Sequence, residues 1–259
     1  MLNYSVMNIT EFQVNIPVNA FVFDCDGTLS LIEGIEVLAQ QNGVGERIKA
    51  LTEYAMSEAG LSSDIYRERL NLVQPSRLQT VELAQQYFAA RVPGIVAVIE
   101  TLQSLGKAVY VVSAGINPAV TLFAAMLGIP ANHVTAVDLN FSAVGDYESY
   151  DEQAYPAQHE GKRIIANKIK ARHDTLIWIG DGMNDVVVKP DILRFIGYGG
   201  AFYRPKIAAA ADFYLKCQSM APLLALGLTA QECISLSNKG RTLLDEGLAL
   251  IAQGEVEIS

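Results

Sequence analysis

The feature that most constrains this chain is a set of short, almost wholly apolar runs that end abruptly at small or acidic residues. The runs span residues 21–24, 109–113, 176–180 and 194–198. Continuous apolar runs of this length are typical of strands buried on both faces, as in a parallel sheet. Helical patterns lie between the runs, and two of them end at Gly106 and Gly128. This alternation predicts an α/β fold with an open parallel sheet flanked by helices.

The first two expected strands are separated by about 80 residues, far more than a simple crossover needs. The intervening segment has helical patterns and no strand pattern, with interruptions at Asn42-Gly43, Gly60 and Pro75-Ser76. We therefore expect a small module of three or four helices at residues 33–92. It would be inserted into a core domain made of residues 1–32 and 93–228.

Two further segments have their own patterns. Residues 137–141, followed by Gly145-Asp146, predict a short hairpin. A C-terminal helical extension is expected over residues 229–259, because Thr229 and Glu232 have capping-box spacing and an apolar stripe follows them.

Composition excludes several classes of protein. Lys and Arg number 19 against 28 Asp and Glu, so the net charge of −9 disfavours nucleic-acid and anionic-lipid partners. The longest apolar runs fall short of the roughly 20 residues of a membrane span, and the N-terminus lacks a secretory-signal pattern. Three widely spaced cysteines favour reduced thiols and a cytoplasmic location. A monomer or homodimer without nucleic-acid or membrane partners is expected.

The first chemical motif is Asp24-Cys-Asp-Gly-Thr28, at the end of a buried run. A calcium-binding EF-hand loop counted from Asp24 would need Gly at its sixth place and Glu at its twelfth, where Leu29 and Ile35 stand. That alternative fails. On its own, the pentapeptide is also compatible with a solvated Asp-Gly turn.

The second motif is Gly180-Asp-Gly-Met-Asn-Asp185, at the end of another apolar run. A dinucleotide-binding fingerprint would need a third glycine at Asp185, where an acid would repel a pyrophosphate. In a parallel sheet, Asp24, Asp26, Asp181 and Asp185 gather at one edge, where they could not all stay ionised without a cation. Oxygen-only ligands predict a hard ion, and Mg²⁺ is the natural choice.

Two more residues complement these acids. Ser113 ends an apolar run, and Lys162 opens the helix before the next one. The segment 111–115 does not match the Gly-x-Ser-x-Gly nucleophile elbow of serine hydrolases, because the first glycine of that motif is absent. A hydroxyl and backbone N–H groups at a strand end suit a phosphoryl oxygen instead. Lys162 alone would be a solvated helix residue, but beside these acids it is expected to bind phosphate.

Together these motifs resemble the haloacid dehalogenase-like superfamily of aspartate-nucleophile phosphohydrolases. The match covers all four of its motifs in order: Asp24 to Thr28, Ser113, Lys162, and Asp181 to Asp185. Within the superfamily, the segment from Phe21 to Leu215 is similar to the phosphoserine phosphatase family. The resemblance implies a Rossmann-like core with a small helical cap, which matches the inserted helical module.

The resemblance also implies roles for individual residues. Asp24 would be the nucleophile that forms an aspartyl-phosphate, and Asp26 the general acid and base. Mg²⁺ would be held by Asp24, the backbone carbonyl of Asp26 and the carboxylate of Asp181. The implied substrate-binding residues of the core are Ser113, Ala114, Lys162 and Asn184, and Ser113, Lys162 and Asn184 would lie at the phosphate. Asp185 would orient Lys162 or a metal-bound water.

In the helical module, Glu33 would bind the ammonium group of O-phosphoserine and Arg69 its carboxylate. Without the resemblance, Glu33 is compatible with a first-turn acid that complements a helix dipole, and Arg69 with a solvated helix arginine.

Three positions depart from the family pattern. Ser57 stands where Gly is usual, Ser62 where Phe is frequent, and Ala114 at the second place of a Ser-Gly-Gly motif. These positions touch the expected substrate pocket, so another small acid, a sugar phosphate or a phosphorylated protein side chain stays open as the substrate. A regulatory or scaffolding protein that binds through its C-terminal helix is a third hypothesis, which the complete set of catalytic carboxylates counts against.

Overall fold

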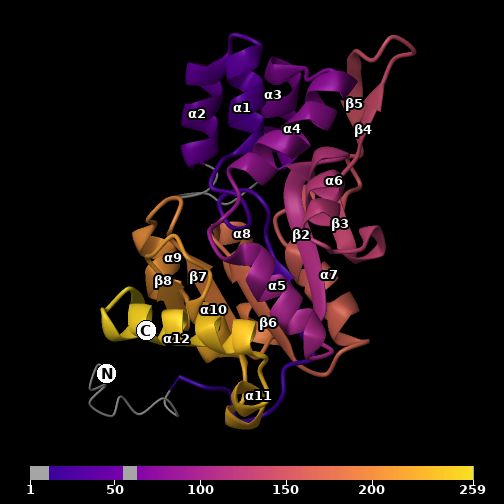
Figure 1. The fold of residues 1–259 in the computed structure, drawn as a ribbon. Helices are drawn as coiled ribbons and strands as arrows, with labels where there is room; N and C mark the ends of the chain where they lie inside the picture. The colour runs from indigo at the N-terminus through magenta and orange to yellow at the C-terminus, as the bar shows by residue number, and fades with distance from the viewer. Residues whose placement is uncertain (1–11, 55–62, 259) are drawn as a thin grey trace.

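The computed structural model describes residues 12–54 and 63–258, and in this part of the chain the main feature is a seven-stranded sheet (Figure 1). The strand order across the sheet is β3-β2-β1-β6-β7-β8-β9. The strands of this sheet are β1 (Ala20–Phe23), β2 (Ala108–Ile116), β3 (Val134–Val137), β6 (Leu176–Gly180), β7 (Arg194–Tyr198), β8 (Phe213–Leu215) and β9 (Val256–Ile258). A separate two-stranded hairpin pairs β4 (Leu139–Phe141) with β5 (Tyr147–Tyr150).

All neighbouring pairs in the main sheet are parallel except β8 and β9, which are antiparallel. The first strand lies in the middle, with Phe23 beside Val111 of β2 and Ile179 of β6. The predicted α/β fold with a mostly parallel sheet is therefore confirmed. Because β1, β2 and β6 run in the same direction, the residues that follow them meet at one edge of the sheet.

Twelve helices accompany the sheet in the described residues. They are α1 (Gly34–Gln41), α2 (Gly45–Tyr54), α3 (Ser63–Val73), α4 (Arg77–Ala89), α5 (Ile95–Ser104), α6 (Ala119–Met126), α7 (Gly161–Lys170), α8 (Met183–Val186), α9 (Pro205–Ala210), α10 (Pro222–Gly227), α11 (Ala230–Ile234) and α12 (Asn238–Ala252).

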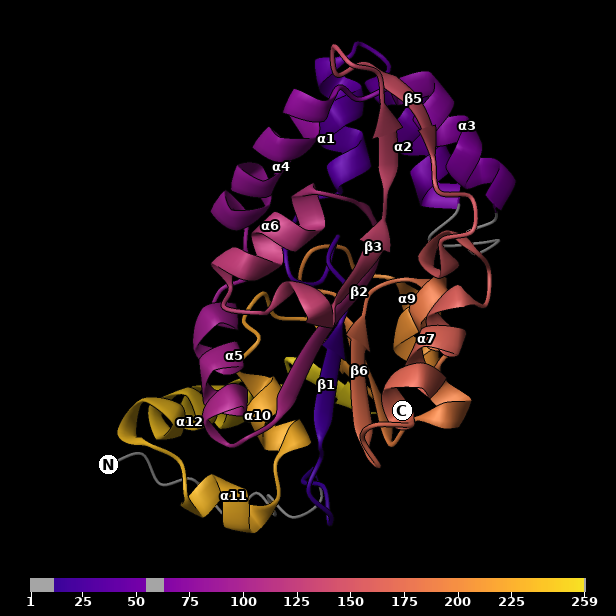
Figure 2. The ribbon, with the colours of Figure 1, turned by 90° about the vertical axis from the view of Figure 1, so that its right-hand side faces the viewer.

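The sheet is covered on both faces, as Figure 2 shows by the separation of α5, α10 and α12 from α7 and α9. Successive side chains of β1 point to opposite faces. Phe21 and Phe23 pack in a core with residues of α5, α6, α10 and α12, whereas Ala20 and Val22 pack with residues of α7 and α9. This two-sided burial explains why the strands are continuous apolar runs.

The segment between β1 and β2 forms a group of four helices, α1 to α4, which we call the helical module. It lies beyond the ends of β1 and β2, and the β4–β5 hairpin runs alongside it (Figure 1). The expected interruption at Asn42-Gly43 separates α1 from α2, and Ser76 starts α4 with a capping box that includes Gln79. Gly60 lies outside the described residues.

The C-terminal segment differs from the single closing helix that the sequence predicts. Thr229 does form a capping box with Glu232, but α11 ends at Ile234 and Ser237 caps a second helix, α12. The chain then returns to the main sheet as β9, a three-residue strand whose shortness hid it in the sequence. None of the described helices has the length and apolar character needed to cross a membrane.

Candidate functional site

The candidate site lies where β1, β2 and β6 end. Asp24 follows β1 directly and Asp181 follows β6 directly. Ser113 was expected at the end of its strand, but β2 continues to Ile116 with an irregular register against β3. The side chains of all three residues are nearly inaccessible to solvent. The strand ends therefore bring these sequence-distant residues to one buried place.

A buried group of three carboxylates forms the centre of the site. One oxygen from each of Asp24, Asp181 and Asp185 lies within 4.8 Å of the others. Burial raises the pKa of Asp181 to about 6 and that of Asp185 to about 7, with further upward shifts from neighbouring acids. Such a group needs compensating positive charge.

Lys162 supplies part of that charge from the first turn of α7. Its Nζ lies 2.8 Å from Asp24 Oδ2 and 2.7 Å from Asp185 Oδ1, and the side chain is 1% exposed. Burial by itself would lower the pKa of Lys162, but Asp185 and Asp24 raise it above its ordinary value. The lysine is therefore a fixed positive charge between two acids.

The oxygens of Asp185 are already engaged by the protein. Oδ1 accepts hydrogen bonds from Lys162 Nζ and from Trp178 Nε1 at 2.8 Å, and Oδ2 accepts one from the Gly182 N–H at 3.3 Å. Gly180 makes room for this carboxylate, because a Cβ there would lie 2.2 Å from Asp185 Cγ. These contacts suit a residue that holds Lys162 in place.

Asp181 has more capacity for an external ligand. Its Oδ1 accepts a hydrogen bond from the Thr28 hydroxyl at 3.3 Å, whereas Oδ2 is buried and has no hydrogen-bond partner. Gly27 has a positive φ of 66°, and a Cβ there would lie 2.5 Å from Asp181 Oδ2. The glycine of the first motif thus lets the backbone turn and leaves room for this oxygen.

The carboxyl of Asp26 lies apart from the three-acid group and faces the helical module. Its Oδ1 accepts hydrogen bonds from the Gly34 N–H at 2.5 Å and from the Tyr87 hydroxyl at 2.6 Å. Burial raises the pKa of Asp26 to about 6, and the Tyr87 and Gly34 hydrogen bonds oppose that rise. Asp26 can therefore exchange a proton near neutral pH.

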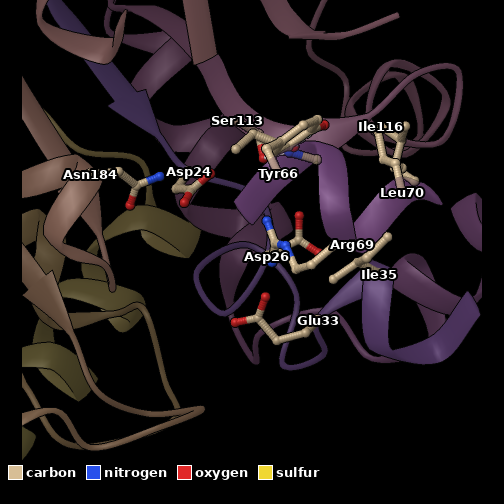
Figure 3. Close-up of a pocket in the computed structure, with 12 residues that line it drawn as sticks. Asp24, Asp26, Glu33, Ile35, Tyr66, Arg69, Leu70, Ser113, Ile116 and Asn184 are labelled. Carbon is tan, nitrogen blue, oxygen red and sulfur yellow. Dashed lines mark hydrogen bonds between the residues drawn. The ribbon is translucent and has the colours of Figure 1, made fainter. Parts of the chain in front are cut away.

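These residues share one pocket with side chains of the helical module (Figure 3). The pocket is lined by Asp24, Asp26, Glu33, Ile35, Tyr66, Arg69, Leu70, Ser113, Ala114, Gly115, Ile116 and Asn184. In this view, Asp24 and Asn184 lie on one side and Glu33, Arg69 and Ile35 on the other. Most of the expected site residues thus line this pocket. Lys162, Asp181 and Asp185 do not line it but lie close to Asp24, which does.

The module contributes two buried residues of opposite charge. Glu33 is 5% exposed and Arg69 is 4% exposed. Burial raises the pKa of Glu33 well above its ordinary value and lowers that of Arg69. Arg69 Nη1 donates a hydrogen bond to Thr52 Oγ1 at 3.3 Å, but Arg69 Nε and Glu33 Oε1 are buried without hydrogen-bond partners. Both residues thus differ from the solvated helix residues that the sequence alone would allow.

The remaining predicted residues also lie at the pocket. Ser113 Oγ accepts a hydrogen bond from the Gly115 N–H at 2.9 Å, and the Ala114 carbonyl accepts one from the Tyr66 hydroxyl at 2.9 Å. The amide oxygen and nitrogen of Asn184 are buried without hydrogen-bond partners. Ser57 and Ser62, which depart from the family pattern, lie outside the described residues.

Three further residues at this site were not predicted from the sequence. Arg204, just before α9, has Nη2 at 3.3 Å from Asp181 Oδ2 and 3.5 Å from Glu33 Oε1. Its loop follows β7, so the rule that sites lie at strand ends could have found it. Tyr66 and Tyr87 come from α3 and α4 and had no sequence signal, since a helical tyrosine is most often a core residue.

Comparisons with known proteins agree with this geometry. A model of the haloacid dehalogenase-like hydrolase family matches residues 21–188. Phosphoserine phosphatases from Rattus norvegicus and Homo sapiens are each 34% identical over 199 residues, which is 76% of this chain and 88% of theirs. A solved phospho-aspartyl intermediate analogue of phosphoserine phosphatase shares the fold, with a TM-score of 0.69, 23% identity, and coverage of 81% of this chain and 98% of that chain.

Proposed function

Because the chain belongs to the haloacid dehalogenase-like hydrolase family, we propose that it is a Mg²⁺-dependent phosphomonoesterase that hydrolyses O-phosphoserine to serine and phosphate. One observation carries the proposal. One pocket is lined by Asp24 of the acid cluster, by Asp26, and by Glu33 and Arg69, whose charges are opposite and whose buried Oε1 and Nε atoms have no hydrogen-bond partner. Relatives named phosphoserine phosphatase support the same substrate.

The metal fits the residues present. Asp24 and Asp181 would hold it through carboxylate oxygens, together with the backbone carbonyl of Asp26. The buried Oδ2 of Asp181 has an ion-pair contact with Arg204 Nη2 at 3.3 Å but no hydrogen-bond partner, which supports this assignment, and an oxygen-only donor set suits Mg²⁺. Asp185 is the third acid of the cluster, but its oxygens are occupied by Lys162, Trp178 and Gly182. When bound, the ion would supply positive charge to the phosphoryl oxygens.

In the first step, a carboxylate oxygen of Asp24 attacks phosphorus. A bond forms between Asp24 and phosphorus, the bond from phosphorus to the serine oxygen breaks, and that oxygen takes the proton of Asp26. Lys162, Ser113 and Asn184 bind the phosphoryl oxygens during this transfer. Asp185 keeps Lys162 directed at the site through their 2.7 Å contact.

In the second step, water attacks the phosphorus of the aspartyl-phosphate. The ionised Asp26 takes a proton from the water, the bond between phosphorus and Asp24 breaks, and phosphate leaves. Asp24 returns to a carboxylate and Asp26 to the protonated acid, so the cycle is balanced. The pKa of about 6 supports both roles for Asp26, because neither protonation state is rare near neutral pH.

Substrate choice comes from the helical module. Arg69 would bind the substrate carboxylate with charge-assisted hydrogen bonds, and Glu33 would bind the ammonium group. Both groups are buried. Glu33 Oε1 and Arg69 Nε have no hydrogen-bond partner, although Glu33 also forms an ion pair with Arg204, so an incoming zwitterion would supply hydrogen bonds that the protein does not. Ile35 and Leu70 line the same pocket and give it apolar walls, which suit a short apolar tether. O-phosphoserine is the smallest molecule that combines these features.

The experiment that tests the proposal is phosphate release from O-phosphoserine by the purified full chain, after exhaustive chelation and again after Mg²⁺ is restored. We expect no turnover with the chelator and full turnover with Mg²⁺. Full turnover without a divalent ion would overturn the metal assignment. Faster turnover of a sugar phosphate or of a phosphorylated protein would overturn the substrate assignment and leave the chemistry standing.

A further inference from the structure

We propose that Tyr87 is a positioning residue for Asp26, which it holds together with the backbone N–H of Gly34 so that Asp26 Oδ2 faces the reacting groups. The inference rests on the proposed function, in which Asp26 transfers the proton of the leaving group. Tyr87 belongs to α4 and Gly34 to α1, so two helices of the module orient a side chain of the core.

The hydrogen bonds determine which oxygen of Asp26 can carry the proton. The Tyr87 hydroxyl and the Gly34 N–H both donate to Oδ1, at 2.6 Å and 2.5 Å. A phenol remains protonated at neutral pH, so Tyr87 stays a donor. An oxygen that accepts two hydrogen bonds is a poor place for a third hydrogen, so the proton resides on Oδ2.

The other oxygen points toward the phosphate side of the pocket. An added Cβ at Gly115 would lie 2.6 Å from Asp26 Oδ2 and 3.1 Å from Ser113 Oγ, so these two oxygens border the same small space. Ser113 is one of the proposed phosphate contacts. Asp26 Oδ2 is therefore on the side where the leaving oxygen would be.

Tyr87 is itself held rigidly. Its side chain is fully buried and stacks on Phe123, with ring centroids 5.5 Å apart and an interplanar angle of 27°. Its backbone carbonyl accepts a hydrogen bond from Ser30 Oγ at 3.1 Å, close to the point where the module rejoins the core. A hydroxyl fixed in this way can hold Asp26 in one orientation without rearranging during catalysis.

Gly34 is shaped to admit this hydroxyl. A Cβ at Gly34 would lie 2.0 Å from the Tyr87 hydroxyl oxygen and 2.7 Å from its ring carbon Cζ. Gly34 is also the first residue of α1, where an N–H group has no partner within the helix and is available to Asp26. The glycine thus supplies one hydrogen bond and leaves room for the other.

The test compares two substrates whose leaving groups differ in their need for a proton. Serine alkoxide must be protonated as it leaves, whereas 4-nitrophenolate leaves without a proton. For Tyr87→Phe with Mg²⁺ present, we expect kcat/KM for O-phosphoserine to fall on the order of tenfold or more, because a hydrogen bond to a charged group is lost. The fall for 4-nitrophenyl phosphate should be less than about threefold, and the inhibition constant of inorganic phosphate should not change.

Two further variants complete the experiment. Tyr110→Phe removes a hydroxyl that contacts His173 at the other end of β2, and it should leave both substrates unaffected. Gly34→Ala moves the Tyr87 hydroxyl without removing it and should show the same selective loss, which keeps the test available if Tyr87→Phe does not fold. An equal loss on both substrates, or no loss on O-phosphoserine, would overturn the proposal.

The outcome separates this inference from the proposed function. If the wild-type protein hydrolyses glycerol 2-phosphate but not O-phosphoserine, the substrate assignment fails. In that case glycerol 2-phosphate replaces O-phosphoserine as the alkyl phosphate. The losses of kcat/KM in Tyr87→Phe for glycerol 2-phosphate and for 4-nitrophenyl phosphate are then compared by the same criteria.

Discussion

The two halves of the pocket differ in how their buried charges are balanced. In the core half, Lys162 lies between Asp24 and Asp185, and every oxygen of Asp185 has a hydrogen-bond donor from the protein. In the module half, Glu33 Oε1 and Arg69 Nε are buried and have no hydrogen-bond partner. The Lys162, Asp24 and Asp185 group of the core half is therefore balanced by the protein itself, whereas Glu33 and Arg69 of the module half keep hydrogen-bonding capacity for a ligand.

This difference suggests that the core half performs the chemistry and that the module half recognises the substrate. Groups that the protein already holds in place need no reorganisation during the reaction, so they suit transition-state stabilisation. A buried polar group without a partner carries a desolvation cost, which a ligand of complementary charge removes. We therefore expect changes in the core half to affect every substrate and changes in the module half to affect only some.

The largest expected effect is in the core half. Asp24→Asn should reduce turnover of every phosphate ester by more than about a thousandfold, because an amide cannot act as the nucleophile. The fold should persist, as circular dichroism and thermal unfolding would show. Asp174→Asn, at an exposed position before β6, is the matched control and should retain activity. Activity above a few per cent in purified Asp24→Asn would contradict the covalent mechanism.

Substitution of Arg69 should have the next largest effect on kcat/KM. Unlike substitution of Asp24, it should affect substrates with a carboxylate much more than substrates without one. Arg69→Ala should lower kcat/KM for O-phosphoserine on the order of a hundredfold, because charge-assisted hydrogen bonds are worth about 1.5–3 kcal/mol each. Arg69→Lys should also weaken it, since Lys cannot form two parallel bonds to a carboxylate. O-phosphoethanolamine, which lacks the carboxylate, should be affected much less.

The control for this experiment is Arg47→Ala, because Arg47 belongs to the same module but its side chain is 66% exposed. It should leave both substrates unaffected. If Arg69→Ala lowered kcat/KM equally for the two substrates, Arg69 would support the fold of the module instead of binding substrate. That result would contradict O-phosphoserine as the substrate.

Substitution of Glu33 should lower kcat/KM by a smaller factor than substitution of Arg69. The loss should depend on the ammonium group of the substrate instead of its carboxylate. Glu33→Gln keeps the shape of the side chain but removes the charge that pairs with an ammonium group, so kcat/KM for O-phosphoserine and O-phosphoethanolamine should fall about tenfold. The value for 3-phosphooxypropanoate, which differs from O-phosphoserine only in lacking the ammonium group, should be nearly unaffected. Glu46→Gln, at an exposed position of α2, is the control. An equal loss of kcat/KM for 3-phosphooxypropanoate would contradict this role.

The smallest effect concerns stability and pH. Burial raises the pKa of Asp181 from its ordinary value of 3.8 to about 6. A carboxyl with a raised folded-state pKa stabilises the fold below the unfolded-state pKa and loses that contribution as pH rises through the folded-state pKa. Between about pH 4 and pH 7, the buried charge should cost the metal-free protein at most about 3 kcal/mol.

Thermal unfolding of the wild type and Asp181→Asn in a chelator would measure this cost. The midpoint of the variant should rise relative to the wild type by several degrees between about pH 5 and pH 8. Added Mg²⁺ should remove that advantage by stabilising the wild type more than the variant. A difference that does not change with pH would contradict the buried charge on Asp181.

The strands that position the site could be predicted because both of their faces are buried. The runs at Phe21, Val109 and Leu176 are continuous and apolar, so their ends located Asp24, Ser113 and Asp181. Strands β8 and β9 have three residues each, too few for a recognisable pattern, and β3 is only half-buried for most of its length.

Within the site, the residues that could be predicted were those with a motif. Tyr87 lies 61 residues from Asp26, and only the folding of α4 against the core brings their oxygens to 2.6 Å. Arg204 reaches both Glu33 and Asp181 from the loop after β7. Neither contact leaves a local spacing in the sequence, because both depend on long-range packing.

The central claim is that the core half performs the chemistry and the module half selects a zwitterionic phosphate ester. Its most direct test is kcat/KM of the wild-type protein with Mg²⁺ for O-phosphoserine, O-phosphoethanolamine and 3-phosphooxypropanoate, which differ only in the carboxylate and the ammonium group. We expect loss of either group to lower kcat/KM, on the order of a hundredfold for the carboxylate and about tenfold for the ammonium group. Equal values for the three substrates would contradict it.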